Sequence, residues 1–395
     1  IQFERRGADL MKTLITNVVV HTMTSEPFKG EVLIEDGYIK ETGYRIKNRE
    51  NIDETIDGKC GLLMPGFIDA HSHIGLNPDG YGYEYDDVNE YSDPVTSNVR
   101  SLDGFTPTDI SIPEAAKGGV MIYCVLTGSA NPVGGLSFIA HYSKSKNVKD
   151  MLISEDNGLK MATGENPKRV YAEQKKMPVT RMGTAAVIRK FFFDGKNYIE
   201  KKKKAEAEGK PFVEHDSKME AAQMVLSKKI PARVHCHRAE DILTAIRIKK
   251  EFDINMVIEH CTEYIKVKDE IKEASIPILL GPILSSRSKV ELKDMTFKSY
   301  KVALEEGVLF GCMSDHPVFP SEVLRLQAGM ACNYGADEKG MLESLTIMPA
   351  KILGIDNEYG SIEEGKKATL CIWNGHPFDA RSKTIWNSVD GFLAE

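Results

Sequence analysis

Residues 65–73 read Pro-Gly-Phe-Ile-Asp-Ala-His-Ser-His, an apolar segment that ends in two histidines, His71 and His73. In an extended strand, residues two apart project to the same side, so the two imidazoles converge on one point. Two imidazoles supply half of a catalytic zinc site, which takes nitrogen and oxygen ligands and keeps one position open for water. The His-x-His spacing alone also suits an ordinary loop, so its meaning depends on the rest of the chain.

Between residues 61 and 353, short apolar segments alternate with stretches of helical character. The apolar segments are LLMPGFIDAH, GVMIYCVLTG, GLSFIAHY, GLKMATGE, ARVHCH, NMVIEH, IPILLG and VLFGCMSD. Eight buried strands separated by helices predict an α/β fold of the (β/α)8 TIM-barrel type. A doubly wound open sheet is the alternative, but it would carry a glycine-rich phosphate turn after an early strand, and this sequence has none.

Both ends of the chain are rich in short alternating segments, and the first end contains Asp36-Gly37, a strong hairpin signal. We therefore predict a small β-sandwich domain built from residues 11–60 and 354–395, and a barrel domain over residues 61–353. Residues 1–10 precede Met11, and we interpret them as a leader or an upstream extension that is not part of the fold.

The composition excludes several classes of protein. The chain has 51 basic and 58 acidic residues, a formal net charge of -7, which opposes binding to nucleic acid. Its seven cysteines are scattered without a Cys-x-x-Cys pair, as expected of buried free thiols in a reducing compartment. No apolar run approaches the roughly 18 residues of a membrane span. We expect a cytoplasmic protein with neither membrane nor nucleic-acid partners.

Three later predicted strands also end in side chains that bind metals. His235 lies near the end of the segment ARVHCH, His260 ends NMVIEH, and Asp315 follows VLFGCMS. The carboxyl ends of barrel strands surround one cavity, so these side chains and the first histidine pair would meet there. Chance placement at all of these ends is improbable, and the sequence predicts a metal centre at the barrel mouth.

These motifs resemble the amidohydrolase superfamily, in particular its imidazolonepropionase-like and prolidase-like branch. The resemblance rests on PGFIDAHSH, on the strand ends at His235 and His260, and on the SDHP block at Asp315. A late segment, LTIMPAKILGID…GSIEEGKKATLCIW, is similar to the family's return to the small β-domain. The resemblance covers nearly the whole chain after Met11.

The resemblance implies a role for each ligand. His71 and His73 would bind the more buried metal, and His235 and His260 the more exposed one. Asp315 would contact the buried metal and accept a proton from the attacking water, whose pKa a metal lowers toward about 7. The expected cofactor is a divalent metal, zinc first, with one or two ions per chain. Manganese, iron and nickel also suit mixed histidine and carboxylate ligands.

The fourth predicted strand leaves two candidates for a ligand that bridges two metals. Lys160 resembles the family's carboxylated lysine in context, whereas Glu165 lies nearer the carboxyl end of the strand, where the cavity is expected. The two positions have opposite parity, so one of them is expected to point inward. Glu165 is slightly favoured, and Lys160 is the alternative.

The fifth and seventh strands raise questions about substrate binding. His235 and His237 share one strand face; we favour His235 as the ligand and assign His237 to the substrate or to the support of a ligand. Arg287, in the loop after the seventh strand, is a candidate for binding a substrate carboxylate through two hydrogen bonds.

The leading interpretation is hydrolysis of an amide by metal-activated hydroxide, with cyclic, imidazolone-like and dipeptide-type C–N bonds all open. Ring deamination at the same metals is the alternative, with Glu240 as the extra acid. A third interpretation, a scaffold without catalysis, is opposed by the retained ligands. We expect a small-molecule substrate and a homo-oligomer, while the loops carry no signature of the substrate itself.

Overall fold

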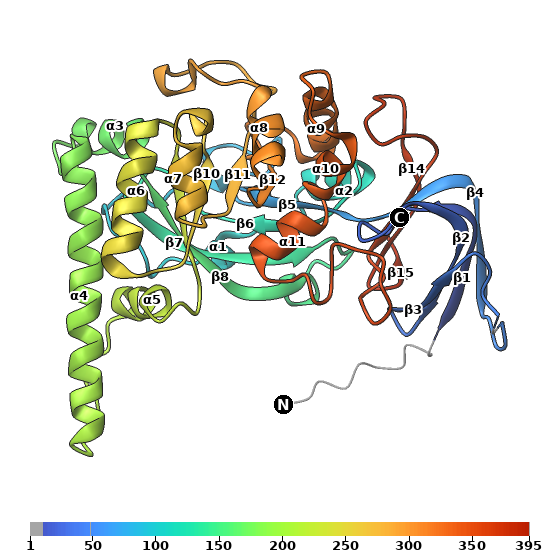
Figure 1. Cartoon of the computed structure of the whole chain (residues 1–395). Coiled ribbons are helices and arrows are strands. Elements are labelled where there is room, and N and C mark those ends of the chain that lie inside the picture. Colours follow the sequence, from blue (N-terminus) through green and yellow to red (C-terminus); the bar gives the residue numbers. More distant parts are fainter. Residues whose placement is uncertain (1–10, 48, 395) are drawn as a thin grey trace.

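The computed structural model describes residues 11–47 and 49–394, which form two β-sheets with helices packed around the larger one (Figure 1). The segment before Met11, interpreted above as a leader, lies outside the described residues. None of the described helices combines the length and the apolar character needed to cross a membrane. All seven cysteines are unpaired; five of them are buried as predicted, whereas Cys60 is exposed and Cys332 is half-buried.

The larger sheet is a nearly closed eight-stranded barrel, and each predicted apolar segment supplies one of its strands. The strands are β5 (Phe67–Ser72), β6 (Val120–Val125), β7 (Val133–His141), β8 (Leu152–Ala162), β9 (Ala232–Cys236), β10 (Met256–His260), β11 (Ile278–Leu280) and β12 (Phe310–Cys312). Most residues of these strands are buried on both faces, the pattern of a sheet covered by helices. The mixed α/β barrel is therefore confirmed.

One strand departs from the predicted alternation of strands and helices. β7 pairs antiparallel with both β6 and β8, and no α-helix separates it from either neighbour. A parallel crossover needs about a dozen residues or more, whereas residues 126–132 connect β6 to β7 directly. The short connection therefore turns the chain back, and the carboxyl end of β7 lies at the opposite end of the barrel from those of the other strands.

Backbone hydrogen bonds join the ends of the first and last barrel strands. The amide of Asp315 donates to the carbonyl of His71 at 3.1 Å, and the amide of His73 donates to the carbonyl of His316 at 2.9 Å. These bonds bring two segments that are far apart in the sequence to the same point of the barrel mouth.

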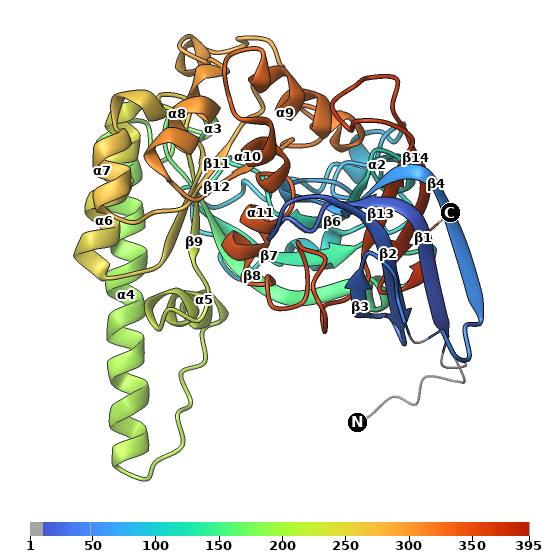
Figure 2. The same cartoon turned by 45° about the vertical axis from the view of Figure 1, so that its right-hand side comes forward.

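Helices surround the barrel on the outside (Figures 1 and 2). The α-helices are α1 (Ser101–Gly104), α2 (Ser111–Lys117), α3 (Glu165–Glu173), α4 (Arg181–Ala207), α5 (Ser217–Leu226), α6 (Ala239–Phe252), α7 (Lys268–Glu273), α8 (Lys298–Glu306), α9 (Leu324–Cys332), α10 (Glu338–Glu343) and α11 (Ile347–Leu353). In α6, Ile242, Ala245 and Ile246 recur at helical spacing and are buried against the barrel. The long helix α4 extends past the barrel strands (Figure 2).

Short 3-10 helices occur in the connections. They are η1 (Tyr83–Tyr85), η2 (Val148–Asp150), η3 (Tyr264–Lys266), η4 (Val290–Leu292) and η5 (Ser321–Val323). η4 follows β11 and carries a buried glutamate to the barrel mouth, as described below.

The smaller sheet is built from both ends of the chain, in the order β15-β14-β13-β4-β1-β2-β3. Its strands are β1 (Lys12–Val20), β2 (Phe28–Glu35), β3 (Tyr38–Gly43), β4 (Glu54–Pro65), β13 (Leu370–Trp373), β14 (Thr384–Val389) and β15 (Phe392–Leu393). All seven belong to one hydrogen-bonded sheet. The predicted hairpin turn lies at Asp36-Gly37, where both residues have positive φ, +56° and +86°.

Trp373 connects the two sheets. It ends β13 and is fully buried, its ring stacks on Phe67 of the first barrel strand with centroids 5.5 Å apart, and the Arg325 guanidinium lies 5.2 Å from its ring centre. A side chain at Gly119 would collide with the indole, since an added Cβ would lie 2.4 Å from Trp373 Cζ2. The junction is thus closely packed around one large apolar group.

We predict that Trp373→Ala lowers the free energy of unfolding by about 3–5 kcal/mol, because it leaves a cavity at this junction. Urea denaturation followed by circular dichroism measures the loss. Trp386→Ala is the matched control: it removes the other, half-buried tryptophan and should cost clearly less. Equal losses in the two variants would contradict this account of the junction.

Candidate metal centre

The first group of ligand-type side chains gathers around Asp315. His71 Nε2 lies 3.0 Å and His73 Nε2 3.1 Å from the same carboxylate oxygen, Asp315 Oδ1. His73 Nδ1 donates to the carbonyl of Leu126 at 2.7 Å, which directs its Nε2 toward the carboxylate. The predicted pair His71 and His73 therefore converges with the predicted general base, although 242 or more residues separate them in sequence.

Two of the strand-end residues have a left-handed backbone. His260 has φ +68° and Asp315 has φ +55°, a region that residues other than glycine seldom occupy. At His260 this conformation interrupts the inward and outward alternation of β10, so that Glu259 and His260 both reach the interior. Such backbone strain is concentrated at functional sites and is held by the surrounding structure.

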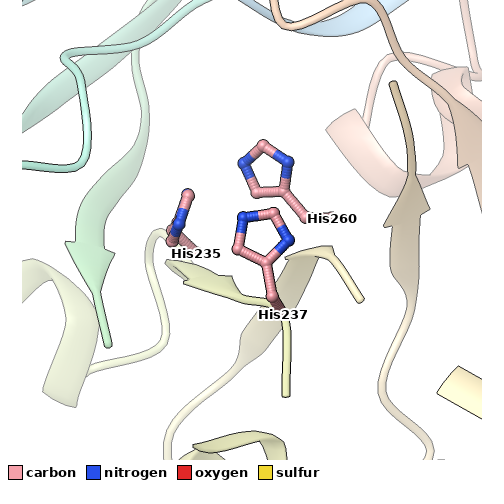
Figure 3. Close-up of side chains that lie close together, drawn as sticks. All are labelled: His235, His237 and His260. Atoms are coloured by element: carbon pink, nitrogen blue, oxygen red, sulfur yellow. The ribbon is translucent and has the colours of Figure 1, made fainter. Parts of the chain in front are cut away.

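A second group consists of three imidazoles, from His235, His237 and His260. The ring centroids are 4.6 Å apart for His235 and His237, 4.3 Å for His235 and His260, and 4.5 Å for His237 and His260. Figure 3 shows the three rings close to one another at the ends of β9 and β10. The Nε2 atom of each ring is buried and has no hydrogen-bond partner among the described residues.

These three imidazoles are neutral at ordinary pH. Burial, the largest effect, lowers the pKa of His237 to about 3 and holds the pKa values of His235 and His260 well below the usual range. His260 Nδ1 donates to the carbonyl of Gly281 at 3.0 Å, which leaves a lone pair on Nε2. Neutral imidazoles with free Nε2 atoms are the form that binds a divalent metal, so the residues present fit such an ion.

Beneath the first group lies a buried carboxylate, Glu259. Its Oε2 accepts a hydrogen bond from Lys160 Nζ at 2.7 Å and lies 3.0 Å from His71 Nδ1, while Oε1 accepts from Arg233 Nε at 2.8 Å. Burial would raise the pKa of Glu259, but the charges of His71, Lys160 and Arg233 outweigh it and hold that pKa well below the usual range. The carboxylate is therefore ionised.

Asp315 is ionised as well. Burial would raise the pKa of its carboxyl group, but the nearby His260 and the hydrogen bonds to His71 and His73 hold that pKa well below its ordinary value. The centre thus combines two ionised carboxylates with five imidazoles at one end of the barrel.

At the fourth strand, the structure favours Lys160, whereas the sequence slightly favoured Glu165. Lys160 is a buried residue of β8 whose Nζ lies 3.4 Å from His71 Nε2. Glu165 lies past the end of that strand, as the first residue of α3, and its carboxylate joins neither group of ligands. The structure thus brings Lys160 and not Glu165 to the centre, because the chain leaves the barrel at Thr163.

Two other candidates lie elsewhere. Arg287 is exposed, and its guanidinium donates to the carbonyls of Lys293 and Met295 in its own loop, at 3.2 and 2.8 Å. Glu240 is also exposed and pairs with Arg238 at 3.2 Å. Neither lines the cavity above the ligands. The predicted carboxylate-binding and deaminase roles of these two residues are therefore not supported.

The ligand residues line an open cavity of about 510 Å³ at the carboxyl end of the barrel strands. Its wall includes His73, Asp315 and all three imidazoles of the second group, together with the cationic side chains of Arg169 and Lys289. Neither cation was predicted from the sequence. A cavity of about 900 Å³ at the opposite end of the barrel contains none of the ligand residues.

A further buried carboxylate, Glu291, was also missed. It lies in η4, and its Oε1 is 3.6 Å from His237 Nε2 and 4.0 Å from His235 Nε2. The same carboxylate accepts hydrogen bonds from Lys289 Nζ at 2.9 Å and from the amide of Glu165 at 3.1 Å. Its segment, SSRSKVELKD, is polar and without periodicity, so no sequence signal indicated a buried position.

Known proteins resemble this chain over most of its length. A model of the amidohydrolase family matches residues 62–391. The solved structure of an amidohydrolase from Thermotoga maritima MSB8 is 50% identical and superposes with a TM-score of 0.94, over 96% of this chain and 99% of that chain.

Curated relatives are more distant. Amidohydrolase tasK from Hapsidospora irregularis is 27% identical over 92% of this chain, which spans only 39% of the length of that relative. A 5-methylthioadenosine/S-adenosylhomocysteine deaminase from Thermoanaerobacter pseudethanolicus is 24% identical, over 92% of this chain and 85% of its own. Together with the match over residues 62–391, these findings establish that the chain belongs to the amidohydrolase family.

Proposed function

We propose that this chain is a metal-dependent hydrolase that cleaves a C–N bond of a small amide, with Asp315 as the general base. The observation that carries the proposal is the position of the Asp315 carboxylate, which contacts both His71 and His73 and lines the cavity. The donors are imidazole nitrogens and carboxylate oxygens, which favour zinc and also suit manganese, iron or nickel.

A divalent ion at this position would lower the pKa of a bound water toward about 7 and polarise the scissile carbonyl. His71 and His73 would hold the ion. Asp315 is ionised, so it can accept the proton of the attacking water at its carboxylate and pass it to the leaving nitrogen. Glu259 keeps the ring of His71 in place through the 3.0 Å contact at Nδ1.

Amide hydrolysis is favoured over ring deamination by the position of Glu240. A deaminase would need this residue as an acid beside the substrate, but its carboxylate pairs with Arg238 on the surface. One of the curated relatives is named a deaminase, so release of ammonia from ring substrates is the outcome that would reverse this choice. A scaffold without catalysis is opposed by the complete set of buried ligands.

We further propose that the substrate carries an anionic group. Arg169 lines the cavity from α3, and within the described residues it makes no ion pair. Lys289 lines the same wall but is partly neutralised by Glu291. Asp86 belongs to the loop after β5 and also lines the cavity, so the two charges of a zwitterionic amide would both find a partner. A guanidinium without a partner favours a carboxylate.

The division into a small domain of residues 11–60 and 354–395 and a barrel of residues 61–353 is retained as part of this proposal. The cytoplasmic location and the homo-oligomer likewise stay predictions.

Removal of the metal with a chelator should abolish turnover, and Asp315→Asn should keep the metal while lowering kcat by about 100- to 10,000-fold, the usual contribution of a general base. Metal analysis and turnover of a panel of small amides measure the two effects. If Asp315→Asn turned over substrate at the wild-type rate, Asp315 would not be the base.

Glu259→Gln should lower the free energy of unfolding by about 3–5 kcal/mol, because it leaves Lys160 and Arg233 buried without their shared anion. It should also weaken metal binding by about 10- to 100-fold, since His71 loses its support. Denaturation and competition with a chelator measure these changes. Glu251→Gln is the control: it breaks a surface pair with Arg189 and should cost about 1 kcal/mol or less. A similar small effect in both variants would refute the role of Glu259.

Arg169→Gln should remove a preference for anionic substrates. N-acetylalanine and N-acetylalaninol differ in the carboxylate, and we expect the ratio of their kcat/KM values to fall by about 10- to 100-fold, as for the loss of a charged hydrogen bond. Arg287→Gln, whose guanidinium binds only its own loop, should leave the ratio unchanged. An unchanged ratio in Arg169→Gln would eliminate this residue as the anion-binding group.

A further inference from the structure

The connection between β5 and α1 is long and carries little regular structure. It runs over residues 73–100, and of the helices and strands it contains only η1. Connections of more than about 12–15 residues without elements of their own are uncommon in compact domains, and most of them are functional loops or linkers. Asn77, Asp86, Val88 and Asn89 of this connection line the cavity above the ligands. The connection therefore forms one wall of the site.

Part of this wall is fixed at its base and free at its tip. The amide of Asp87 donates to the carbonyl of Leu76 at 2.8 Å, so the ends of residues 77–86 meet as in an Ω-loop. Residues 80–86 form the tip. Their amides bond only to carbonyls of the same loop, and none of the tip residues makes an ion pair with the described part of the chain. Segments with so few contacts open at low cost in free energy, so the tip can move while the base stays in place.

The tip has the sequence GYGYEYD and exposes three tyrosines. Tyr81, Tyr83 and Tyr85 are 49%, 87% and 39% exposed, and the ring centroids of Tyr81 and Tyr85 lie 4.7 Å apart. Tyrosine offers a large and stiff contact surface at low cost in conformational entropy, which makes it frequent in binding loops. Val318, on the cavity wall beyond Asp315, is also exposed. Apolar groups gathered around the mouth of a cavity indicate a surface that becomes covered when a ligand binds.

Two glycines leave the backbone of the tip free to turn. Gly80 has φ +82°, and an added Cβ at Gly80 or at Gly82 would meet nothing within 4 Å. No packing holds the chain at these two points, and a few such positions are enough to absorb the change in φ and ψ that closure of a loop requires. Asp86, at the other end of the tip, already lines the cavity. A rotation about the glycines would bring the rings toward the mouth.

We propose that residues 80–86 are a lid that closes over the bound substrate and packs its tyrosines on an apolar side chain beside the substrate's amine. This inference rests on the proposed function, which pairs that amine with Asp86. A ligand shifts a loop toward closure only if it binds the closed form better than the open one. The three rings provide this difference, because closure removes their apolar surface and that of the substrate from water. The favoured substrates are zwitterionic amides with a large apolar group on the side of the amine.

A tryptophan at the tip tests closure in the full-length, metal-loaded protein. Phenylalanyl-alanine and glycyl-alanine are zwitterionic amides that differ in one benzyl group, and the Asp315→Asn background keeps them intact. With Tyr83→Trp in that background, saturating phenylalanyl-alanine should shift the emission to shorter wavelength and reduce quenching by acrylamide, and glycyl-alanine should do so less. Tyr44→Trp, at an 81% exposed position beside the small sheet, should respond to neither peptide. Trp373 and Trp386 contribute equally to both variants.

Turnover with Asp315 present provides a second measurement. Tyr83→Ser and Tyr85→Ser should each lower the ratio of kcat/KM for phenylalanyl-alanine to that for glycyl-alanine by about 10-fold, the usual discrimination of an apolar contact. Tyr44→Ser should leave this ratio unchanged.

The lid and the proposed function fail in different ways. Emission of Tyr83→Trp that neither peptide changes would overturn the lid, and so would an unchanged ratio in both serine variants. Protection of the tryptophan by phenylalanyl-alanine, without turnover of any amide by the protein that retains Asp315, would support the lid and contradict the proposed function alone.

Discussion

The carboxylate of Glu259 is the interaction on which the centre depends. An ion buried in a protein interior costs several kcal/mol of hydration, and this cost is offset only when its oxygens are fully engaged. Glu259 meets this condition through Lys160 on β8, Arg233 on β9 and His71 on β5. Arg233 also donates to the carbonyl of Ala70 at 2.7 Å. One charge therefore fixes strands that lie far apart in sequence, and it fixes them directly beneath the ligands.

The closure of the barrel depends on a second buried carboxylate, Asp69. It accepts a hydrogen bond from Ser321 Oγ at 2.8 Å and further bonds from the amide and hydroxyl of Ser314, which follows the last strand. Burial raises the pKa of this carboxyl group, in contrast to those of Glu259 and Asp315, because hydroxyl and amide partners only partly offset its desolvation. Asp69 therefore joins the first barrel strand to the segment that follows the last one, whereas the two low-pKa carboxylates support the ligands.

The sequence alone was enough to predict the features that depend on short-range patterns of residue type. Buried barrel strands appear in the sequence as apolar runs. The ligand candidates His71, His73, His260 and Asp315 could be found because they end or follow such runs. The direction of β7 was missed, although the sequence carries a signal for it: only residues 129–134 separate its segment from the preceding one, too few for the crossover that a parallel strand needs.

Other features depend on tertiary contacts or on unusual backbone. To choose between Lys160 and Glu165, one must know where the chain leaves the barrel, and the structure shows this position. The inward position of both Glu259 and His260 results from a positive φ at His260, which strand alternation does not predict. Glu291 and Arg169 both lie in polar segments of the sequence. The packing of η4 buries Glu291, and the packing of α3 places Arg169 at the cavity.

The two groups of histidines differ in a way that bears on their roles. His71 and His73 contact an ionised carboxylate, so their Nε2 atoms have a partner even without a metal. In the second group, burial removes three Nε2 atoms from water, and nothing among the described residues replaces the lost hydrogen bonds. Each such atom costs about 1–3 kcal/mol, so the arrangement disfavours the folded chain unless a ligand binds there. Because the bonds at Thr262 and Gly281 hold the rings of His237 and His260 in place, these two rings do not relieve the cost by turning away. An arrangement that is unfavourable alone and rigid in shape is what selective binding of a small cation requires.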